Sequence, residues 1–209
     1  MAKDPAGAIG LYLVELQAAG VSRTTLKSVD PSRNQSRITF AQAPAQPLGE
    51  GAQGWAGVER LLDRAAVLMA FEQVGGASAC LDMAVAYANE RFAFGRPIGS
   101  FQAIKHRLAD AFLAVERASA LAYFATLTVA EDDPRRTVAV SMAKSAAGDC
   151  QRLLTRDGLQ LHGGVGYTWE HDLHLWLKRA AMSELVFGTS AWHRARLARA
   201  MGLVAEEAR

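Results

Sequence analysis

At 209 residues, half of them apolar and about a fifth charged, the chain is long enough for one domain or one domain plus a fragment, and it is too apolar for a disordered tail. A formal net charge of +2 with scattered arginines argues against a nucleic-acid-binding surface. The start lacks the basic and apolar regions of a signal peptide, and polar residues interrupt each apolar stretch before the roughly 20 residues that span a bilayer. We therefore expect a cytoplasmic protein with no membrane partner.

The two cysteines, Cys80 and Cys150, stand far apart with no Cys-x-x-Cys spacing. This arrangement indicates neither a disulfide framework nor a zinc cluster, and it favours two reduced, buried thiols.

The pattern of residues 9–40 is typical of short β-strands. A β-rich run at 9–16 is followed by a second run after Gly20, and the third run, 36–40, follows an Asp-Pro-Ser-Arg-Asn turn at 30–34. Three short strands leave an edge that needs a partner, so we expect part of a larger β-structure. A connector rich in Pro and Gly follows. Residues 1–52 are therefore predicted to be a partial β-domain with its connector.

After Trp55 the spacing of apolar residues predicts long helices. Apolar residues recur at three-and-four spacing over 58–94, and Gly75–Gly76 within this segment favours close packing against another helix. The other predicted helices run over 101–130, from the Asp133–Pro134 start to Leu161, over 173–181 and over 190–207, with breaks at Pro97 and at Gly163–Gly164. Long helices joined by short loops predict an antiparallel helical bundle over residues 53–209, and hence a mainly α fold with a small N-terminal β remnant.

The segment 159–176 concentrates histidines, carboxylates and glycines. His171 and His174 are three residues apart, but a metal site usually needs three or four ligands, and the His-Glu-x-x-His pattern of helical zinc enzymes is absent. We predict no metal, and interpret these side chains as helix caps and hydrogen-bonded bundle residues. The main chain at Gly163 and Gly164 can approach a flat or anionic ligand, although a glycine at a helix C-terminus also occurs without any ligand.

Three stretches together resemble the acyl-CoA dehydrogenase family: "RFAFGRPIGSFQ" at 91–102, "QLHGGVGYTWEHDLHLWLKRA" at 160–180 and "FGTS" at 187–190. They are similar in order and spacing to the motifs of that family's C-terminal helical domain, and residues 9–40 resemble the second half of its middle β-domain. The resemblance implies FAD as the cofactor and an acyl-CoA thioester as the substrate.

The resemblance also implies roles for single residues. Arg91 would contact the FAD diphosphate, for which a forked guanidinium is well suited, Phe94 would pack beside the cofactor, and Gln102 would bind near its adenosine end. Gln160, Gly163 and Gly164 would approach the dinucleotide of a neighbouring subunit, and Thr189 would offer its hydroxyl to the diphosphate. The alternatives are a solvated Arg91 at a helix end and a Phe94 that belongs to the core. Since such sites are divided between subunits in the family, an oligomer is expected.

The sequence departs from the family at the catalytic base. Phe187 stands where relatives carry the glutamate that precedes Gly-Thr, and Ala65 and Ala66 occupy the acid and arginine places of the family's other base position. Glu184 and Glu72 match no motif, and we interpret them as surface carboxylates. No catalytic residue is assigned, so we expect the isolated chain to be inactive.

The family's N-terminal helical domain and the first half of its β-domain have no counterpart here. Two explanations stay open: a fragment of a larger enzyme, or a subunit lacking the base that pairs with a base-bearing chain, as in some bacterial enzymes acting on steroids. Trp169 and His171 are similar to residues of those proteins. The main hypothesis is an FAD-dependent acyl-CoA dehydrogenase subunit or fragment, with an electron-transfer flavoprotein as a further partner. The alternative is a non-catalytic assembly subunit in a homo- or hetero-oligomer.

Overall fold

The computed structural model describes residues 2–3, 7, 9–48 and 54–204. Its contacts divide the chain into two compact units, 1–64 and 65–209, and the division falls within the first long helix. The sequence-based boundary between residues 52 and 53 stays a prediction.

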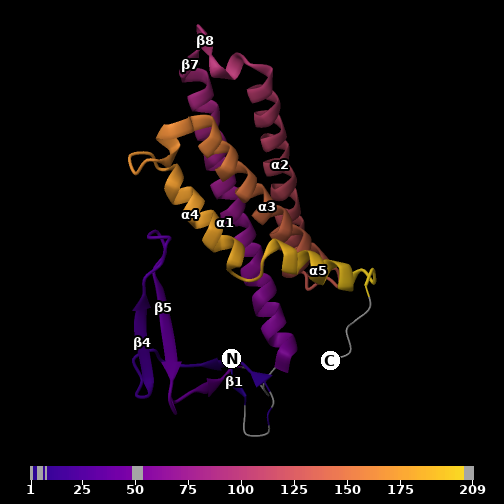
Figure 1. Ribbon diagram of the computed structural model, residues 1–209. Helices are drawn as coiled ribbons and strands as arrows, with labels where there is room; N and C mark the ends of the chain where they lie inside the picture. The colour runs from indigo at the N-terminus through magenta and orange to yellow at the C-terminus, as the bar shows by residue number, and fades with distance from the viewer. Residues whose placement is uncertain (1, 4–6, 8, 49–53, 205–209) are drawn as a thin grey trace. The chain divides into compact units, whose positions relative to one another are not determined.

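A β-hairpin dominates the first unit (Figure 1). Strands β4 (Val21–Leu26) and β5 (Gln35–Phe40) pair antiparallel, with Val21 opposite Phe40 and Leu26 opposite Gln35. The loop between them contains the expected Asp-Pro-Ser-Arg turn. There the buried Asp30 accepts a hydrogen bond through Oδ1 from the Ser32 amide at 2.9 Å, which closes the turn locally.

The run at 9–16 was expected to form one strand, and this prediction is wrong. It is divided between β2 (Ile9–Gly10), which pairs with β1 (Ala2–Lys3), and β3 (Tyr12–Leu13), which pairs with β6 (Gln46–Pro47). Leu11 lies between the two pairings, and its carbonyl accepts from the Leu48 amide at 2.9 Å. Residues 46–47 lie in the segment that was expected to be a connector, and they form the strand that pairs with β3.

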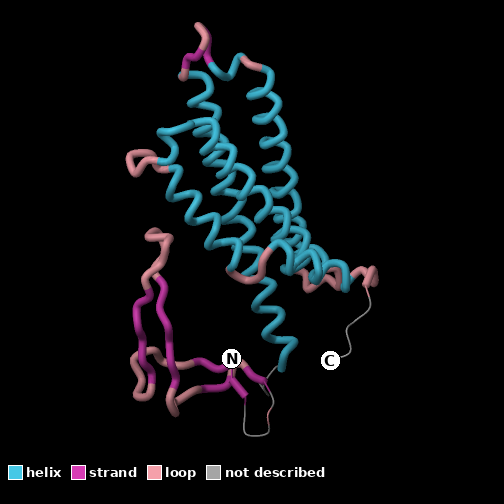
Figure 2. Tube along the Cα trace, viewed as in Figure 1, coloured by secondary structure: helices cyan, strands magenta, loops and turns pink. Residues whose placement is uncertain are grey.

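The second unit is a helical bundle (Figure 2). Its long helices are α1 (Gly54–Glu90, shared with the first unit), α2 (Gln102–Ala130) and α3 (Arg136–His162), and the shorter helices are α4 (Leu173–Leu185) and α5 (Ser190–Ala200). Between α1 and α2 the chain forms a small hairpin of β7 (Phe92–Ala93) and β8 (Arg96–Pro97), followed by the 3-10 turn η1 (Ile98–Ser100). A second 3-10 turn, η2 (Gly163–Tyr167), follows α3. The mainly α fold is confirmed.

Alanines at the helix contacts explain how closely these helices pack. Small side chains allow helix axes to approach, and the buried cluster of α1, α2 and α3 is rich in them: Ala66, Ala70, Ala77, Ala111, Ala118, Ala122, Ala125, Ala139, Ala143 and Ala147. Gly76 belongs to the same kind of contact, since a Cβ there would lie 2.7 Å from Gln151 Nε2. Gly75 faces open space, so the close approach expected of the glycine pair occurs at Gly76.

Several helix ends differ from the sequence expectation. The first helix ends at Glu90, because the Arg91 carbonyl accepts from the Ile98 amide at 2.8 Å and the chain turns into the β7–β8 hairpin. The third begins at Arg136, and Asp133 Oδ1 accepts from the Arg135 amide at 2.7 Å just before it. The last helix ends at Ala200, and residues 205–207 of the expected helix lie outside the described part.

Helix α2 is the single helix in the described ranges that is long and apolar enough to cross a membrane by length and composition. A third of its most apolar window is buried in the bundle, where it contributes residues such as Ala111, Val115 and Ala118 to the core. Core helices of soluble proteins pass the same test, so the length and composition of α2 alone are weak evidence for a membrane span.

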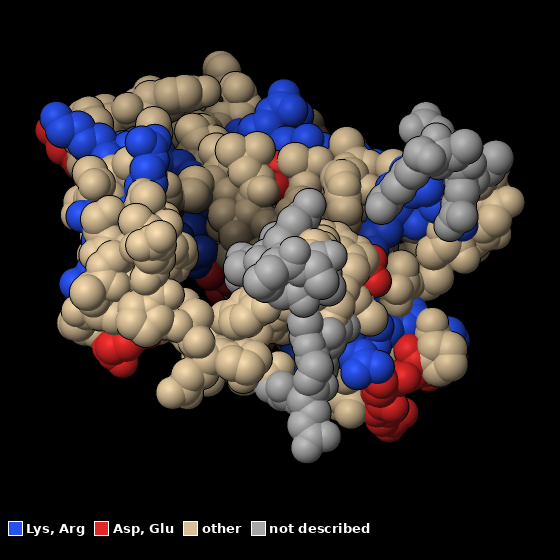
Figure 3. All heavy atoms as spheres, turned by 90° about the horizontal axis from the view of Figure 1, so that it is seen from below, with Lys and Arg blue, Asp and Glu red and all other residues tan. Residues whose placement is uncertain are grey.

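Charges are distributed in local groups. On the face in Figure 3, lysines and arginines form several separate patches, and carboxylates lie beside some of them. Within the bundle, Asp149 bridges two helices by accepting from Arg152 on α3 at 2.8 Å and from Arg194 on α5 at 2.7 Å. Exposed pairs of this kind contribute little to stability.

Candidate functional site

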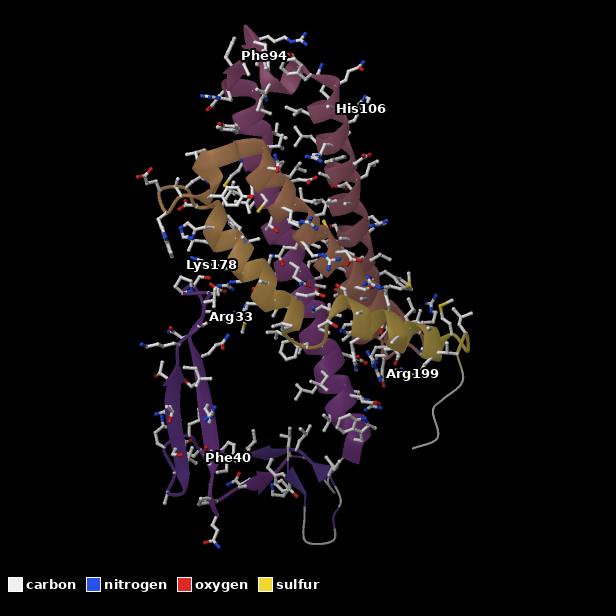
Figure 4. The ribbon with its side chains drawn as sticks, viewed as in Figure 1. Arg33, Phe40, Phe94, His106, Lys178 and Arg199 are labelled. Carbon is white, nitrogen blue, oxygen red and sulfur yellow. The ribbon has the colours of Figure 1, made fainter. Side chains whose placement is uncertain are left out.

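The hairpin at the end of α1 carries two of the predicted site residues. Arg91 follows the helix directly and its side chain is exposed, while its amide donates to the Tyr87 carbonyl at 2.9 Å. Phe94 occupies the tip with a φ of 54° and is 96% exposed (Figure 4). This excludes the reading of Phe94 as a core residue. A large aromatic side chain held away from the protein in a left-handed turn is suited to contact a ligand or another chain.

Gln102 starts α2 close to this hairpin, and its side chain is exposed. The guanidinium of Arg96 lies 4.1 Å from the ring centroid of Phe101, and the Phe101 ring meets that of Phe94 edge-on at 6.3 Å. These contacts tie the hairpin to the start of α2. Arg91, Phe94 and Gln102 therefore present a cation, an aromatic ring and an amide from one end of the bundle.

The end of α3 supplies the next group. Gln160 is exposed on its last turn, and Gly163 ends the helix with a φ of 61°, its amide donating to the Leu159 carbonyl. A Cβ at Gly163 or Gly164 would meet nothing within 4 Å. The main chain is therefore open on this side, and Gly163 is required by its backbone conformation rather than by a neighbour.

His162, the last residue of α3, packs against the end of α1 that leads into the β7–β8 hairpin. Its buried ring stacks on Tyr87 with centroids 4.3 Å apart, and its Nδ1 donates to the Gly158 carbonyl at 2.8 Å. Burial lowers the pKa of His162, and nearby His171 lowers it further, while the bond to Gly158 acts in the opposite direction. Because Tyr87 lies one turn before Arg91, the segments at 91–102 and 160–164 share one region of the bundle.

His171 and His174 lie at the start of α4. His171 Nδ1 accepts from the Leu173 amide at 3.2 Å, as a helix-capping group does. His174 Nδ1 lies 3.2 Å from Lys178 Nζ, and that ammonium sits 3.7 Å from the ring centroid of Trp169. Within the described residues, no three potential metal ligands gather.

Thr189 lies at the beginning of α5. Its Oγ1 accepts from the Trp192 amide at 3.1 Å, which caps the helix, and a hydroxyl in this position can also donate. Lys144 on α3 reaches the preceding residue, donating to the Gly188 carbonyl at 3.0 Å. Since Gly163 follows α3 and Lys144 lies 19 residues earlier on it, the two regions are on the order of 28 Å apart at the rise of an α-helix. Thr189 thus lies away from the other predicted residues.

The two carboxylates interpreted as surface groups have structural partners. Glu184 is half-buried and accepts from the Ser190 amide at 2.7 Å and from its hydroxyl at 3.0 Å. Glu72 accepts from Arg179 Nη1 at 2.9 Å. The surface interpretation of Glu184 is wrong, because a carboxylate six residues ahead satisfies the first amide of α5.

Sequence reasoning missed a cavity between α2 and α3. Its volume is about 590 Å³, and its lining includes Arg107, Arg152 and Arg156 together with Gln160 and Tyr167. Asp157 also lines it and lies 3.7 Å from Arg107 Nε. Asp149 lines it too and accepts from Arg152 at 2.8 Å, so the three arginines leave only a small excess of positive charge beside Gln160 and the exposed ring of Tyr167.

Residues 52–202 match the family model described as acyl-CoA dehydrogenase, C-terminal domain. The acyl-CoA dehydrogenase IpdE2 of Mycobacterium tuberculosis is 46% identical over 159 residues, which cover 76% of this chain and 45% of that protein. The acyl-CoA dehydrogenase FadE34 of the same organism is 36% identical over 184 residues, covering 87% of this chain and 25% of that protein.

Solved structures share the fold. Butyryl-CoA dehydrogenase from Megasphaera elsdenii superposes with a TM-score of 0.86 at 25% identity, covering 96% of this chain and 54% of that one. A variant of the Tcur3481-Tcur3483 steroid ACAD gives 0.85 at 28% identity, with 97% and 54% covered. The ChsE4-ChsE5 complex from Mycobacterium tuberculosis gives 0.84 at 25%, with 98% and 55% covered.

The chain spans about half the length of these solved chains and less than half the length of the curated relatives it matches. The family model accounts for most of the chain, and the bundle superposes on that of the relatives, so the chain belongs to the acyl-CoA dehydrogenase family.

Proposed function

We propose that this chain is one component of an FAD-dependent acyl-CoA dehydrogenase, contributing part of a flavin site that another polypeptide completes. The observation that carries the proposal is the exposure of Arg91 and Phe94 beside the open turn at Gly163–Gly164. A guanidinium, a free aromatic face and uncovered main chain suit an anionic dinucleotide with a flat ring system. Bound FAD would accept hydride in the α,β-dehydrogenation of an acyl-CoA thioester.

The predicted residues would hold this cofactor from two places. Arg91, Phe94, Gln102, Gln160, Gly163 and Gly164 lie at one end of the bundle, and Thr189 lies on the order of 28 Å away at the start of α5. Such a separation favours a flavin site shared between chains, in which each region faces a different cofactor. An oligomer is therefore part of the proposal.

The catalytic base would come from another chain. Phe187 has no group that accepts a proton, and Ala65 and Ala66 have none either. Glu184 lies three residues before Phe187 and Glu72 lies on the same helix as Ala65, but each is engaged with another element of the bundle. The chain's own residues would bind and orient the cofactor, and no proton-transfer role is assigned to them.

The similar proteins support a mixed assembly and a lipid or steroid substrate. Two of the superposed structures are described as a steroid ACAD named by two proteins and as a ChsE4-ChsE5 complex. Another, superposing with a TM-score of 0.83 at 27% identity, is described as an electron transferring flavoprotein of Acidaminococcus fermentans. We accordingly propose a cytoplasmic hetero-oligomer with a second acyl-CoA dehydrogenase chain, and an electron-transfer flavoprotein as acceptor.

The test measures dehydrogenation of a panel of acyl-CoA thioesters, steroid-linked ones included, with a dye acceptor. It uses the chain alone and together with the dehydrogenase encoded by a neighbouring gene. We expect a flavin absorption band and turnover with the partner, and neither with the chain alone. Robust turnover by the isolated chain would refute the shared-site proposal. Assembly that never takes up FAD would favour a non-catalytic scaffold, the alternative that the missing carboxylates support.

A further inference from the structure

The corner between α4 and α5, residues 186–190, has a backbone that its surroundings must maintain. Phe187 has a φ of 58° and Gly188 a φ of 100°. A left-handed conformation is unfavourable for a phenylalanine, so it persists only where neighbouring groups fix the chain. This corner also carries Thr189, so its geometry determines where that hydroxyl points.

A buried lysine holds one side of the corner. Lys144 on α3 is 0% exposed, and its Nζ donates to the Ser183 carbonyl at 3.2 Å and to the Gly188 carbonyl at 3.0 Å. Burial lowers the pKa of this ammonium, while the nearby Glu184 carboxylate acts in the opposite direction. Lysine side chains are seldom fully buried without such partners, so the position is specific to these acceptors.

Groups from the two flanking helices hold the other side. His193 on α5 is buried, and its Nε2 donates to the Phe187 carbonyl at 2.9 Å. Glu184 on α4 accepts from the Ser190 amide at 2.7 Å, and the Ser190 hydroxyl lies 3.3 Å from the Ser145 carbonyl of α3. The Phe187 and Gly188 carbonyls and the Ser190 amide and hydroxyl are thus bound by groups from three helices.

Gly148 on α3 makes room for this arrangement. It lies one turn after Lys144, and a Cβ there would overlap both Glu184 Oε2 and Ser190 Oγ. Three residues of α3 therefore contact the corner in different ways. Lys144 donates to it, the Ser145 carbonyl accepts from it, and Gly148 leaves space for it.

We propose that Lys144, Glu184 and His193 are positioning residues that hold the corner so that Thr189 and the start of α5 can bind the flavin diphosphate. The inference rests on the proposed function for the identity of the ligand. The link to Thr189 is direct: Gly188, whose carbonyl Lys144 binds, precedes it, and Ser190, whose amide Glu184 binds, follows it. With both neighbours held, the Thr189 hydroxyl has a fixed position from which it can donate to a ligand.

The first experiment needs no cofactor. Amide hydrogen exchange is compared between the wild-type chain and Lys144→Met, whose unbranched side chain is one atom shorter and lacks the ammonium donors. We expect at least about tenfold faster exchange at Ser190, Trp192 and His193 with little change in the middle of α2. The matched control Arg152→Met removes an exposed cation from the same helix and should leave these amides unchanged. Unaltered exchange in Lys144→Met, or an equal rise across the whole bundle, would overturn the positioning role.

A conservative pair separates positioning from general damage. Glu184→Gln retains an oxygen that can accept from the Ser190 amide, so its exchange should stay near wild type, whereas Glu184→Ala should lose protection at that amide about tenfold or more. This pair also covers the case in which Lys144→Met fails to fold. Equal behaviour of the two variants would contradict the role assigned to the carboxylate.

The second experiment measures FAD affinity by titration of the chain mixed with its partner dehydrogenase. We expect Lys144→Met and Glu184→Ala to weaken FAD binding by at least about tenfold, and Glu184→Gln to stay within about threefold of wild type. If the wild-type assembly binds FAD and Lys144→Met binds it equally tightly, this inference fails and the proposed function stands. If the wild-type assembly binds no FAD, both fail, whatever the exchange results show.

Discussion

His162 sits where three features of the bundle meet: the end of α3, the last turns of α1 and the loop that leads to α4. Its ring is buried against Tyr87 and lies 4.5 Å from the ring of His171, while Nδ1 is used by the Gly158 carbonyl. A proton added to this ring would place a charge in a buried position beside a second histidine. The folded state therefore favours the neutral form of the His162 ring.

This position makes stability depend on pH. The pKa of His162 is lowered in the folded protein, chiefly by burial, so near and below the ordinary value of 6.5 the unfolded chain binds the proton more readily. The free energy of unfolding should then fall as the pH drops through about 6.5. We expect urea denaturation at pH 5.5 to occur at lower urea than at pH 7.5, and His162→Asn to flatten this difference. The control His106→Asn, at an exposed position of α2, should retain it. A wild-type slope in His162→Asn would contradict the assignment.

The two thiols lead to a second expectation at this scale. Burial raises the pKa of Cys80 to about 12 and that of Cys150 to about 11, from an ordinary 9.0. Since the thiolate is the reactive form, the shift alone slows alkylation by about a thousandfold at Cys80 and about a hundredfold at Cys150. Labelling with iodoacetamide, followed by peptide mass spectrometry, should modify neither cysteine in native protein and both in urea. Fast native labelling of Cys80 would show that the core opens locally.

Residues that act alone were more accessible to sequence reasoning than residues that act through contacts. The helix start at Ser190 and the helix end before Gly163 follow from local backbone preferences. Lys144 gives no local signal, because an isolated lysine in a helical sequence ordinarily faces solvent, and its burial depends on carbonyls some forty residues away. Glu184 was misread for the same reason, since its partner belongs to the next helix.

Two neighbouring glycines of α1, Gly75 and Gly76, allow the effect of helix propensity on stability to be measured apart from the effect of packing. Both lie within α1, but Gly75 faces open space, while a Cβ on Gly76 would lie 2.7 Å from Gln151 Nε2 and 3.4 Å from the Trp176 ring. Gly75→Ala should raise the free energy of unfolding by about 0.5–1 kcal/mol, because alanine favours the helix. Gly76→Ala should lose that gain, because the buried Gln151 must shift. Urea denaturation of the two variants tests the order, and Gly76→Ala being the more stable would contradict the packing.

The long helices followed from their apolar spacing, whereas the shortest elements did not. The 58–94 segment predicts most of α1, since one helix face is buried along much of its length. The strands β3 and β6 are two residues each and are defined only by pairing across more than thirty residues. A run of β-forming residues cannot reveal where such a partner lies, so the 9–16 segment was read as one strand.

At the scale of the molecule, α2 is apolar on two sides. One side lies in the bundle core, and the other exposes Phe112, Leu113, Tyr123 and Leu127 within about 100° of the helix circumference at 100° per residue. Leu113 and Tyr123 are each 63% exposed. This second face explains why α2 is apolar enough to resemble a membrane-spanning helix, and an exposed apolar stripe of this kind is typical of a surface that meets another chain.

We expect this face of α2 to join two copies of the chain within the proposed oligomer, and therefore to control self-association of the chain. We expect the double variant Leu113→Glu, Leu127→Glu to shift the chain toward monomer in sedimentation velocity by at least about tenfold in dissociation constant. Its helical circular dichroism should persist, because neither side chain belongs to the core. Leu203→Glu serves as the control, since it places the same charge at an exposed apolar position beyond α5. An equal shift in both would indicate a general effect of charge, and an unchanged association state in the double variant would mean that another surface joins the chains.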